Sequence, residues 1–408
     1  MHARPPAADP RVAAVLAQYP TRRQVLGVAS GAAALAALAA CSPPPAPASS
    51  SAAPKPTLPQ DVSATEKSVK FANWTAYLDY DEKTKRYPTL EAFQKKTGLT
   101  ASYTEDIDDN DSYFNKIAPQ LRAKQDIDRD IFVFTDWMAN RIIRARLCQP
   151  LELIEIPNAV NLLPSLKNVS FDPGRQYSLT WQSGFAGLGW DKSKVKKGLK
   201  NVADLWSPEL KGKVVVLSEY RDTVGLTMMA QGVDPSGTFT KVQFEQAADD
   251  ISKRISDGNI RRVRGNSYLQ DLQSGNAIAG IVWSGDIFVL RAETGNENWE
   301  FAIPESGGTL WSDNMMVPIT SRHRRNAEML MNYYYDPAVA AQVAAWVNYI
   351  CPVQGAQAEM EKIDPELAKS QYIFPTADFV AKNARGFRAL SAAEEATYDA
   401  VWAKVVGN

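Results

Sequence analysis

The chain has 408 residues, of which 45% are apolar and 22% are charged, a composition typical of a soluble globular protein long enough for two ordinary domains. It holds 45 basic and 46 acidic residues, and without residues 1–40, which contribute four arginines and one aspartate, the counts become 41 and 45. This mildly acidic balance offers no footprint for nucleic acid, which needs clustered Lys and Arg, but suits a cationic partner.

Residues 1–40 are predicted to be an export signal peptide and not a transmembrane helix. Arg22-Arg23 precedes a charge-free run rich in Ala and Leu, which ends in small residues at Ala40. The arginine pair resembles a twin-arginine export signal, although Val25 stands where that signal prefers Phe. The mature protein is therefore expected outside the cytoplasm.

Leu38-Ala-Ala-Cys41 resembles the bacterial lipobox, which implies cleavage before Cys41 and acylation of its sulfur. The alternative is an Ala-rich helix with a buried cysteine. A lipid on Cys41 would hold the protein at the extracytoplasmic face of the cell membrane or in the periplasm, while its body stays in water. Residues 41–65 are rich in Pro, Ala and Ser, and are predicted to form a semi-rigid tether.

Few side chains of this sequence suit a metal site or a reactive centre. The only histidines are His2, in the leader, and His323, which removes most metal sites and every His-based catalytic triad. Neither a metal nor a cofactor is expected. Export permits a disulfide between Cys148 and Cys351, and two independent buried thiols are the alternative.

The body alternates predicted strands and helices, the order expected of an α/β sheet. Its first part is predicted as a strand from Val69 into an aromatic loop at Tyr77, a helix at 90–98, a strand at 99–103, a solvated acidic loop at 105–111, a helix at 113–124 and a strand at 130–137. The later part is predicted as a turn at 171–177, a pair of strands through Trp181 and Trp190, strands at 213–218 and 279–283 that each lead into a helix, and a helical stretch at 326–346 that Pro337 interrupts.

The glycines at 184, 187 and 189 have a looser pattern than a phosphate-binding loop. Gly184-Phe-Ala-Gly-Leu-Gly189 lacks the Gly-x-Gly-x-x-Gly order, and no Lys-Ser or Lys-Thr follows it. The segment is therefore expected to allow close strand packing.

Several predicted strands end in an aromatic residue, an acid or both. Trp311 and Asp313 lie two residues apart in the stretch 308–318 and would point to the same side of an extended chain. The alternative for this stretch is a core Trp beside a solvated Asp. Since ligands of open α/β sheets bind beyond the carboxyl ends of strands, the ends are expected to share one cleft. The other ends carry Trp74 and Tyr77, Trp137, Trp283, and Glu219 and Asp222, for which helix capping is the alternative role.

Rings and carboxylates in one cleft favour a ligand whose ammonium groups are separated by methylenes, such as a linear polyamine. A sugar remains an alternative, because sugars also stack on rings and bind carboxylates. A ferric-ion site built on Tyr333-Tyr-Tyr335 is another, although packing within a predicted helix explains those residues. An enzyme is not expected, because Glu219 and Asp222 would lie on one helix face instead of flanking a glycosidic bond.

A set of motifs, in consistent order between Val69 and Pro352, resembles the bacterial spermidine/putrescine-binding proteins of ABC importers. The motifs are Asn73-Trp-Thr-Ala-Tyr77, Leu205-Trp-Ser-Pro-Glu-Leu-Lys-Gly212, Gly280-Ile-Val-Trp-Ser-Gly285, Gly307-Gly-Thr-Leu-Trp-Ser-Asp313 and Tyr335-Asp-Pro-Ala-Val-Ala340. The resemblance implies a type II periplasmic-binding-protein-like α/β fold with two lobes, each a mixed sheet flanked by helices, and the ligand in the cleft between them. Lobe 1 is predicted as 66–182 plus 312–357, and lobe 2 as 183–311 plus 358–408.

The resemblance also implies partners and contacts. The protein is expected to be a monomer that binds a polyamine by hinge closure of its lobes and delivers it to the permease subunits of an ABC importer. Ala76 stands where the spermidine-specific pattern has Glu, so one amine contact is missing. The implied ligand contacts are Trp74, Thr75, Tyr77, Thr135, Trp137, Glu219, Asp222, Trp283, Trp311, Asp313 and Tyr349.

Overall fold

The computed structural model describes residues 57–407. The predicted signal peptide at 1–40, the lipobox with Cys41 and most of the predicted tether lie outside these residues. The helices of the described range include none that is long and apolar enough to cross a bilayer.

The end of the predicted tether is part of the body. The backbone N–H of Val62 donates to Arg322 O at 2.8 Å, the N–H of Arg325 donates to the Asp61 carboxylate at 3.0 Å, and Ser63 is buried. The prediction that the tether reaches residue 65 is therefore wrong, because hydrogen bonds fix the chain from about Asp61 onward.

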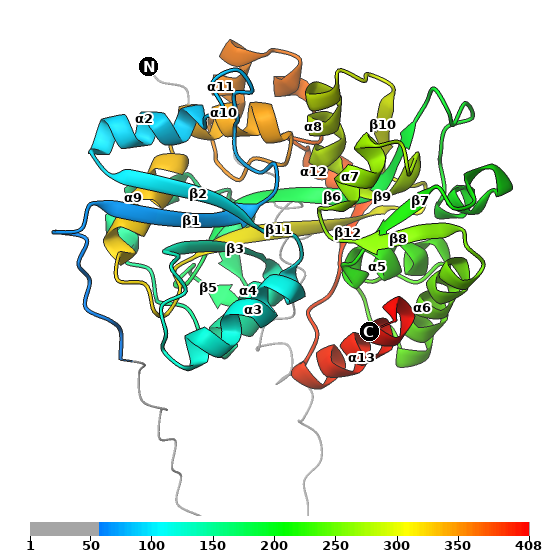
Figure 1. Cartoon of the computed structure of the whole chain (residues 1–408), viewed down its shortest axis with the longest axis horizontal. Helices are drawn as coiled ribbons and strands as arrows, with labels where there is room; N and C mark the ends of the chain where they lie inside the picture. Colours follow the sequence, from blue (N-terminus) through cyan, green and yellow to red (C-terminus); the bar gives the residue numbers. More distant parts are fainter. Residues whose placement is uncertain (1–56, 408) are drawn as a thin grey trace, which may run out of the picture.

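One mixed sheet of ten strands runs through the molecule, in the order β2-β1-β3-β11-β6-β9-β7-β8, with β10 paired to β6 and β12 to β11 (Figure 1). Its first half is made of three parallel strands, β1 (Ser68–Trp74), β2 (Thr100–Ile107) and β3 (Ile131–Thr135). Its second half is also parallel, with β7 (Val214–Leu217), β8 (Ile260–Arg264) and β9 (Ala279–Trp283).

Two long strands join these halves through the middle of the sheet. β6 (Leu179–Asp191) pairs antiparallel with β11 (Gly308–Met316) and with β9, while β11 also pairs antiparallel with β3. The predicted pair of strands through Trp181 and Trp190 is thus a single strand of 13 residues. The shorter strands are β10 (Trp299–Ala302), β12 (Ala384–Gly386) and the separate hairpin of β4 (Asn168–Val169) and β5 (Asp172–Pro173).

Glycines keep β6 continuous, as the expected close packing requires. A Cβ on Gly184 would lie 2.5 Å from Cζ2 of Trp311 and 2.7 Å from Cδ1 of Tyr349. A Cβ on Gly187 would lie 2.6 Å from the carbonyl oxygen of Ala302. The bare backbone of β6 is therefore the surface on which these neighbours pack.

Helices cover both faces of the sheet in each half (Figure 1). In the first half, α2 (Pro88–Thr97) lies on one side, and α3 (Asn110–Arg122) and α4 (Asp136–Arg144) on the other. In the second half, α7 (Tyr268–Gln273) and α8 (Ser284–Thr294) lie opposite α5 (Tyr220–Ala230) and α6 (Lys241–Ser256). The remaining helices are α9 (Arg324–Tyr334), α10 (Pro337–Val347), α11 (Ala356–Ile363), α12 (Ala377–Asn383) and α13 (Ala392–Val406).

Short 3₁₀ turns connect several of these elements. The predicted helix boundaries agree with the structure where a glycine or a proline marks the end or the start of a helix. α2 ends at Gly98, whose φ is +73°, and Pro337 begins α10 after α9 has ended. The 3₁₀ turns are Leu153–Glu155, Pro157–Asn161, Pro164–Leu166, Val202–Trp206, Pro208–Leu210 and Leu367–Lys369.

The prediction that the acidic stretch 105–111 forms a solvated loop is wrong for the first part of that stretch. β2 continues through Glu105 and Asp106 to Ile107, and the Glu105 carboxylate accepts the backbone N–H of Ala76 at 3.0 Å. β2 tolerates these acids because it is an edge strand, which leaves side chains of one face near solvent. Asp109 then caps α3 by accepting the N–H of Ser112.

Of the two alternatives left open for Cys148 and Cys351, a disulfide or two independent buried thiols, the structure shows the second, since both thiols are free and buried. Cys148 pairs with Pro318 just beyond β11, whereas the Cys351 backbone bonds to Ile373. Each sulfur fills its own part of the core, and burial raises the pKa of the Cys351 thiol to about 12. Neither thiol is therefore reactive at neutral pH.

Candidate functional site

All eleven residues predicted to contact a ligand line one cavity. It encloses about 1020 Å³ of empty space, part of it open to solvent. The predicted residues around it are Trp74, Thr75, Tyr77, Thr135, Trp137, Glu219, Asp222, Trp283, Trp311, Asp313 and Tyr349. Segments more than 250 residues apart in the sequence thus meet around one space, which is the convergence that the strand-end pattern predicted.

Strand β11 supplies the floor of this cavity. Thr309, Trp311 and Asp313 alternate along β11, so their side chains point to the same face of the sheet. The stretch is therefore a central strand, and its Asp313 is buried instead of solvated. Trp311 packs against Gly184 of the neighbouring strand, where a Cβ would collide with its ring.

Five aromatic rings form a continuous cluster beside β11. Trp283 lies edge to face with Trp74 and with Trp311, at ring-centroid distances of 6.0 and 6.3 Å. Tyr349 continues the cluster, at 5.3 Å from Trp311 and 5.2 Å from Tyr77. The indole N–H groups of Trp74 and Trp311 are buried and have no hydrogen-bond partner among the described residues, so the ring wall keeps unused donors.

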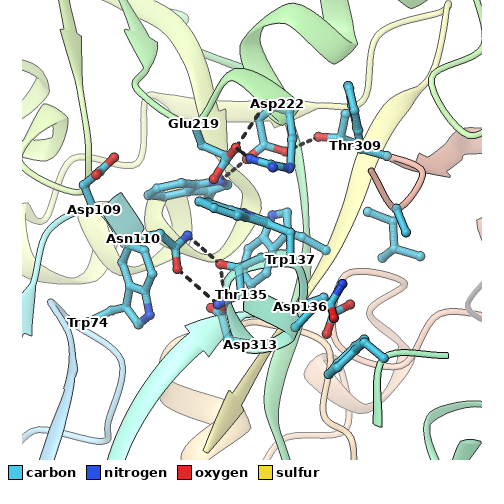
Figure 2. A pocket seen from close by; sticks show the side chains of 18 of the residues that line it. Trp74, Asp109, Asn110, Thr135, Asp136, Trp137, Glu219, Asp222, Thr309 and Asp313 are labelled. Atoms are coloured by element: carbon cyan, nitrogen blue, oxygen red, sulfur yellow. Dashed lines mark hydrogen bonds and ion pairs between the residues drawn. The ribbon is translucent and has the colours of Figure 1, made fainter. Parts of the chain in front are cut away.

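Asp313 is the most perturbed carboxylate in this wall. It accepts a hydrogen bond from the Thr135 hydroxyl at 2.7 Å (Figure 2). It accepts a second from the Tyr77 hydroxyl at 3.0 Å. Burial raises the pKa of Asp313 to about 7, against the smaller lowering by these two donors. The free energy lost when the carboxylate is removed from water is therefore larger than the free energy gained from its two hydrogen bonds with neutral hydroxyls.

Asp222 and Asp286 occupy two similar environments. Asp222 accepts from Nε1 of Trp283 at 2.8 Å and from the Thr309 hydroxyl. Asp286 accepts from the hydroxyls of Tyr268 and Tyr349, each at 2.7 Å, and from Asn266 at 3.1 Å. Burial raises the pKa of each aspartate to about 6.

The three aspartates share a further property. Within residues 57–407, none of them forms an ion pair with a Lys or Arg side chain. Buried carboxylates without a counter-ion are costly, so a structure that keeps three of them beside a ring wall is prepared to receive positive charge.

Glu219 and Trp137 lie in the cavity wall but already have a cationic neighbour. The Glu219 carboxylate caps α5 by accepting the N–H of Arg221, and it also pairs with the Arg221 guanidinium at 3.2 Å. That guanidinium lies 3.7 Å from the ring centroid of Trp137. Arg221 was not predicted from the sequence, since no local pattern distinguishes it from a surface arginine.

Other lining residues were also missed. Asp286 was not among the predicted contacts, although it follows Trp283 by three residues, the same spacing that separates Asp222 from Glu219. The remaining lining residues outside the prediction are Asp109, Asn110, Asp136, Asn140, Ser170, Phe171, Asn266, Thr309, Leu310, Phe387, Arg388, Ala389, Leu390 and Glu395.

The tyrosines of the ferric-ion alternative do not line the cavity. Tyr333 packs against Phe93, and Tyr334 against Trp181. The hydroxyl of Tyr335 donates to the carbonyl oxygen of Thr180 at 2.6 Å. Packing accounts for all three residues, as expected from their place at α9.

Comparisons with known proteins agree with this geometry. A spermidine/putrescine-binding periplasmic protein of Escherichia coli (strain K12) is 26% identical over 311 residues, which cover 76% of this chain and 84% of that protein. The putrescine-binding periplasmic protein PotF of the same organism is 25% identical over 338 residues, covering 79% and 86%. Both relatives match the resemblance predicted from the motifs, which is confirmed.

A solved structure shows the same fold. The spermidine/putrescine ABC transporter substrate-binding protein PotD of Streptococcus pneumoniae superposes with a TM-score of 0.65 at 23% identity, over 83% of this chain and 98% of that one. The predicted periplasmic-binding-protein-like α/β fold is thereby confirmed.

The family model described as bacterial extracellular solute-binding protein matches residues 89–371, more than half of the chain. Members of this family bind solutes outside the cytoplasm, which supports the predicted export and confirms that the chain is not an enzyme. The chain therefore belongs to the family of bacterial extracellular solute-binding proteins.

Proposed function

We propose that this protein captures linear polyamines of the putrescine and spermidine kind for an ABC importer, by closing two lobes around the cation. The observation that carries the proposal is the wall of Asp222, Asp286 and Asp313 with its adjoining rings, where the buried carboxylates accept from neutral donors and, within residues 57–407, form no ion pair. The named ligands of the similar proteins support the same ligand class.

Each part of a polyamine finds a matching surface in this cavity. A carboxylate gives an ammonium a charge-assisted hydrogen bond, about twice as strong as a neutral one. The faces of Trp283 and Trp311 add cation–π attraction of about 0.5–2 kcal/mol per contact and cover the methylenes between the charges. A neutral sugar would gain the stacking but would leave the carboxylates uncompensated.

The division into lobe 1 (66–182 plus 312–357) and lobe 2 (183–311 plus 358–408) is part of the proposal. The contacts that support a closed state bridge the turn after β2 and the ends of β7 and β8. Asp108 accepts the backbone N–H of Asn266 at 2.9 Å through its carbonyl and the N–H of Ser267 at 2.6 Å through its carboxylate. The Ser218 hydroxyl donates to Asp109 at 2.5 Å. Ligand that bridges both lobes would favour this closed state, which the permease senses.

Gly265 gives a test of closure that leaves every ligand contact in place. A Cβ at this position would lie 2.0 Å from the carbonyl oxygen of Asp108, so the two segments could not meet as they do. We expect Gly265→Ala to weaken polyamine affinity by about tenfold, since part of the binding energy must then restore closure. Calorimetry measures the affinity, and small-angle scattering of the ligand-saturated variant should show a larger radius of gyration.

Gly237→Ala is the matched control, because a Cβ there has only an ordinary contact at 3.7 Å. If Gly265→Ala binds as tightly as Gly237→Ala and scatters alike, the contact between the turn after β2 and the end of β8 has no part in closure.

Anchoring through lipid on Cys41 is proposed from Leu38-Ala-Ala-Cys41 alone, which lies outside the described residues. The protein is expected to be a monomer. We expect the exported wild-type protein to fractionate with membranes and Cys41→Ser to appear in the soluble extracytoplasmic fraction. Equal partitioning of both proteins in cell fractionation would count against the anchor.

Titration calorimetry of the wild-type protein tests the function. Putrescine and spermidine are expected to bind at micromolar concentrations or tighter, whereas maltose and ferric citrate are expected to give no saturable heat. Saturable binding of maltose alone would favour the sugar alternative, and binding of ferric citrate alone would favour an iron carrier.

A further inference from the structure

The length of strand β11 between Thr309 and Asp313 gives an estimate of the distance between two ends of the cavity. Asp222 is hydrogen-bonded to Thr309, and Asp313 lies four residues further along the same strand, on the same face. At about 3.3 Å per residue, four residues of a strand span roughly 13 Å. Figure 2 shows Asp222 with Thr309 at one end of the cavity and Asp313 with Thr135 at the other.

This scale sets the length of the ligand that can use both carboxylates. This span separates the backbones of Thr309 and Asp313. Taking the two carboxylates to lie about as far apart, with an ammonium about 2.8 Å inside each, leaves roughly 7 Å between the two nitrogens. An extended methylene chain advances about 1.25 Å per bond, so four or five methylenes place two nitrogens roughly 6–7.5 Å apart. Trp311 lies between Thr309 and Asp313 on β11, and its ring, with the adjoining ring of Trp283, would cover those methylenes.

The cavity wall near Asp222 already holds a positive charge. The Arg221 guanidinium lies 3.7 Å from the ring centroid of Trp137, 3.2 Å from the Glu219 carboxylate and 3.8 Å from that of Glu395. Arg221 is only 6% exposed, and its side chain lines the cavity. Its Nη2 has no hydrogen-bond partner among the described residues. The Trp137 ring and the Glu219 carboxylate are therefore already bound by the Arg221 guanidinium.

We propose, on the basis of the proposed function, that Arg221 makes the cavity prefer diammonium ligands with four or five methylenes over longer triamines, by occupying a ring and a carboxylate that a third ammonium would otherwise use. A triamine with the same first two amines carries its extra aminopropyl arm roughly 4–5 Å further. An ammonium on that arm could bind Trp137 and Glu219 only beside the Arg221 guanidinium, and the two like charges repel each other where little water screens them.

The wild-type protein and two variants test this limit. Calorimetry with putrescine, cadaverine and spermidine is expected to show the diamines binding at least about tenfold more tightly than spermidine in the wild type. Arg221→Ala removes the internal cation and frees both Trp137 and Glu219, so spermidine affinity should rise by about tenfold or more while putrescine affinity changes little. In the double variant Arg221→Ala with Glu219→Gln, the gain for spermidine should disappear, because the carboxylate that received the third ammonium is gone.

Arg141→Ala is the matched control. Arg141 also contacts the ring of Trp137, at 4.9 Å, but it pairs with Asp111 and Asp399 and, at 3.9 Å, with Glu395, and it does not itself line the cavity. Its loss should leave the ratio of putrescine to spermidine affinity unchanged.

The outcomes distinguish a failure of the role assigned to Arg221 from a failure of the proposed polyamine binding. If spermidine binds the wild type as tightly as putrescine, or if Arg221→Ala and Arg141→Ala leave the same ratio, Arg221 does not set ligand length although the protein binds polyamines. If no amine binds the wild type, the proposed function and this limit both fail. Should Arg221→Ala not fold, the wild-type ratio and Arg221→Gln, which keeps the length but not the charge, decide the question.

Discussion

Replacing Asp313 with asparagine is expected to weaken putrescine binding by about 100-fold or more, because the ligand's ammonium loses its charged acceptor. The same change should raise the thermal stability of the ligand-free protein at pH 8. Asp313 is buried, and its carboxylate has two hydroxyl donors but no counter-ion among the described residues, so asparagine removes a charge that the empty cavity cannot compensate. Calorimetry and thermal denaturation measure the two effects.

Asp172→Asn is the matched control. Asp172 is a buried aspartate whose carboxylate also accepts only neutral donors, from Gln176, Tyr177 and Ser178, but it lies outside the cavity. Its replacement should lower stability and leave the affinity within about threefold of wild type. If Asp313→Asn behaves like Asp172→Asn, the role assigned to Asp313 is wrong.

Acidification is expected to weaken polyamine binding by about 100-fold or more between pH 8 and pH 5. Burial raises the pKa of Asp313 to about 7 and those of Asp222 and Asp286 to about 6 in the ligand-free protein. An ammonium binds the ionised carboxylates, so each carboxyl costs about a factor of ten in affinity per pH unit below its pKa. Ligand binding near pH 6.5 should release protons, which calorimetry in buffers of different ionisation enthalpy measures.

The stability of the ligand-free protein should change in the opposite direction. A carboxyl whose folded-state pKa lies above its usual value of 3.8 stabilises the fold while it is protonated, and that contribution is lost as pH rises through about 6 to 7. The melting temperature without ligand should therefore fall between pH 5 and pH 8 through these groups, and the increase caused by saturating putrescine should grow. A ligand-induced increase that is the same at pH 5 and pH 8 would contradict these assignments.

The strand-end residues could be predicted because their signal is local. Trp311 and Asp313 are two residues apart on an extended stretch, and the period of two fixes them on one face whatever the rest of the fold does. The same holds for Trp283 at the end of β9 and Trp74 at the end of β1. Their meeting in one cavity followed from the rule that strands of an α/β sheet present their ends at a shared edge.

What the sequence could not predict depends on partners that are distant along the chain. The close packing on the glycines of β6 was predicted, but the strands through Trp181 and Trp190 were predicted as a pair, whereas they form one strand on which the ring of Trp311 and the backbone of Ala302 pack. Arg221 became part of the site only because α4 brings Trp137 against it. No periodicity reports such a contact between two helices.

Errors at the ends of elements have the same origin. Glu105 and Asp106 form part of β2 although they are acidic, because β2 is an edge strand and Arg129 pairs with Asp106 at 2.6 Å. Asp61 belongs to the body and not to the tether because the N–H of Arg325 reaches it. In both cases a tertiary hydrogen bond overrides what composition indicates.

The most direct test of cation recognition compares two ligands that differ only in charge. Putrescine and 1,4-butanediol have the same four methylenes, but the diol replaces each ammonium with a neutral hydroxyl group. Titration calorimetry at pH 8 should show saturable putrescine binding and no detectable diol binding at 100 times that concentration, a difference of about 3 kcal/mol or more. Comparable affinities for the two would contradict recognition by the buried carboxylates of Asp222, Asp286 and Asp313.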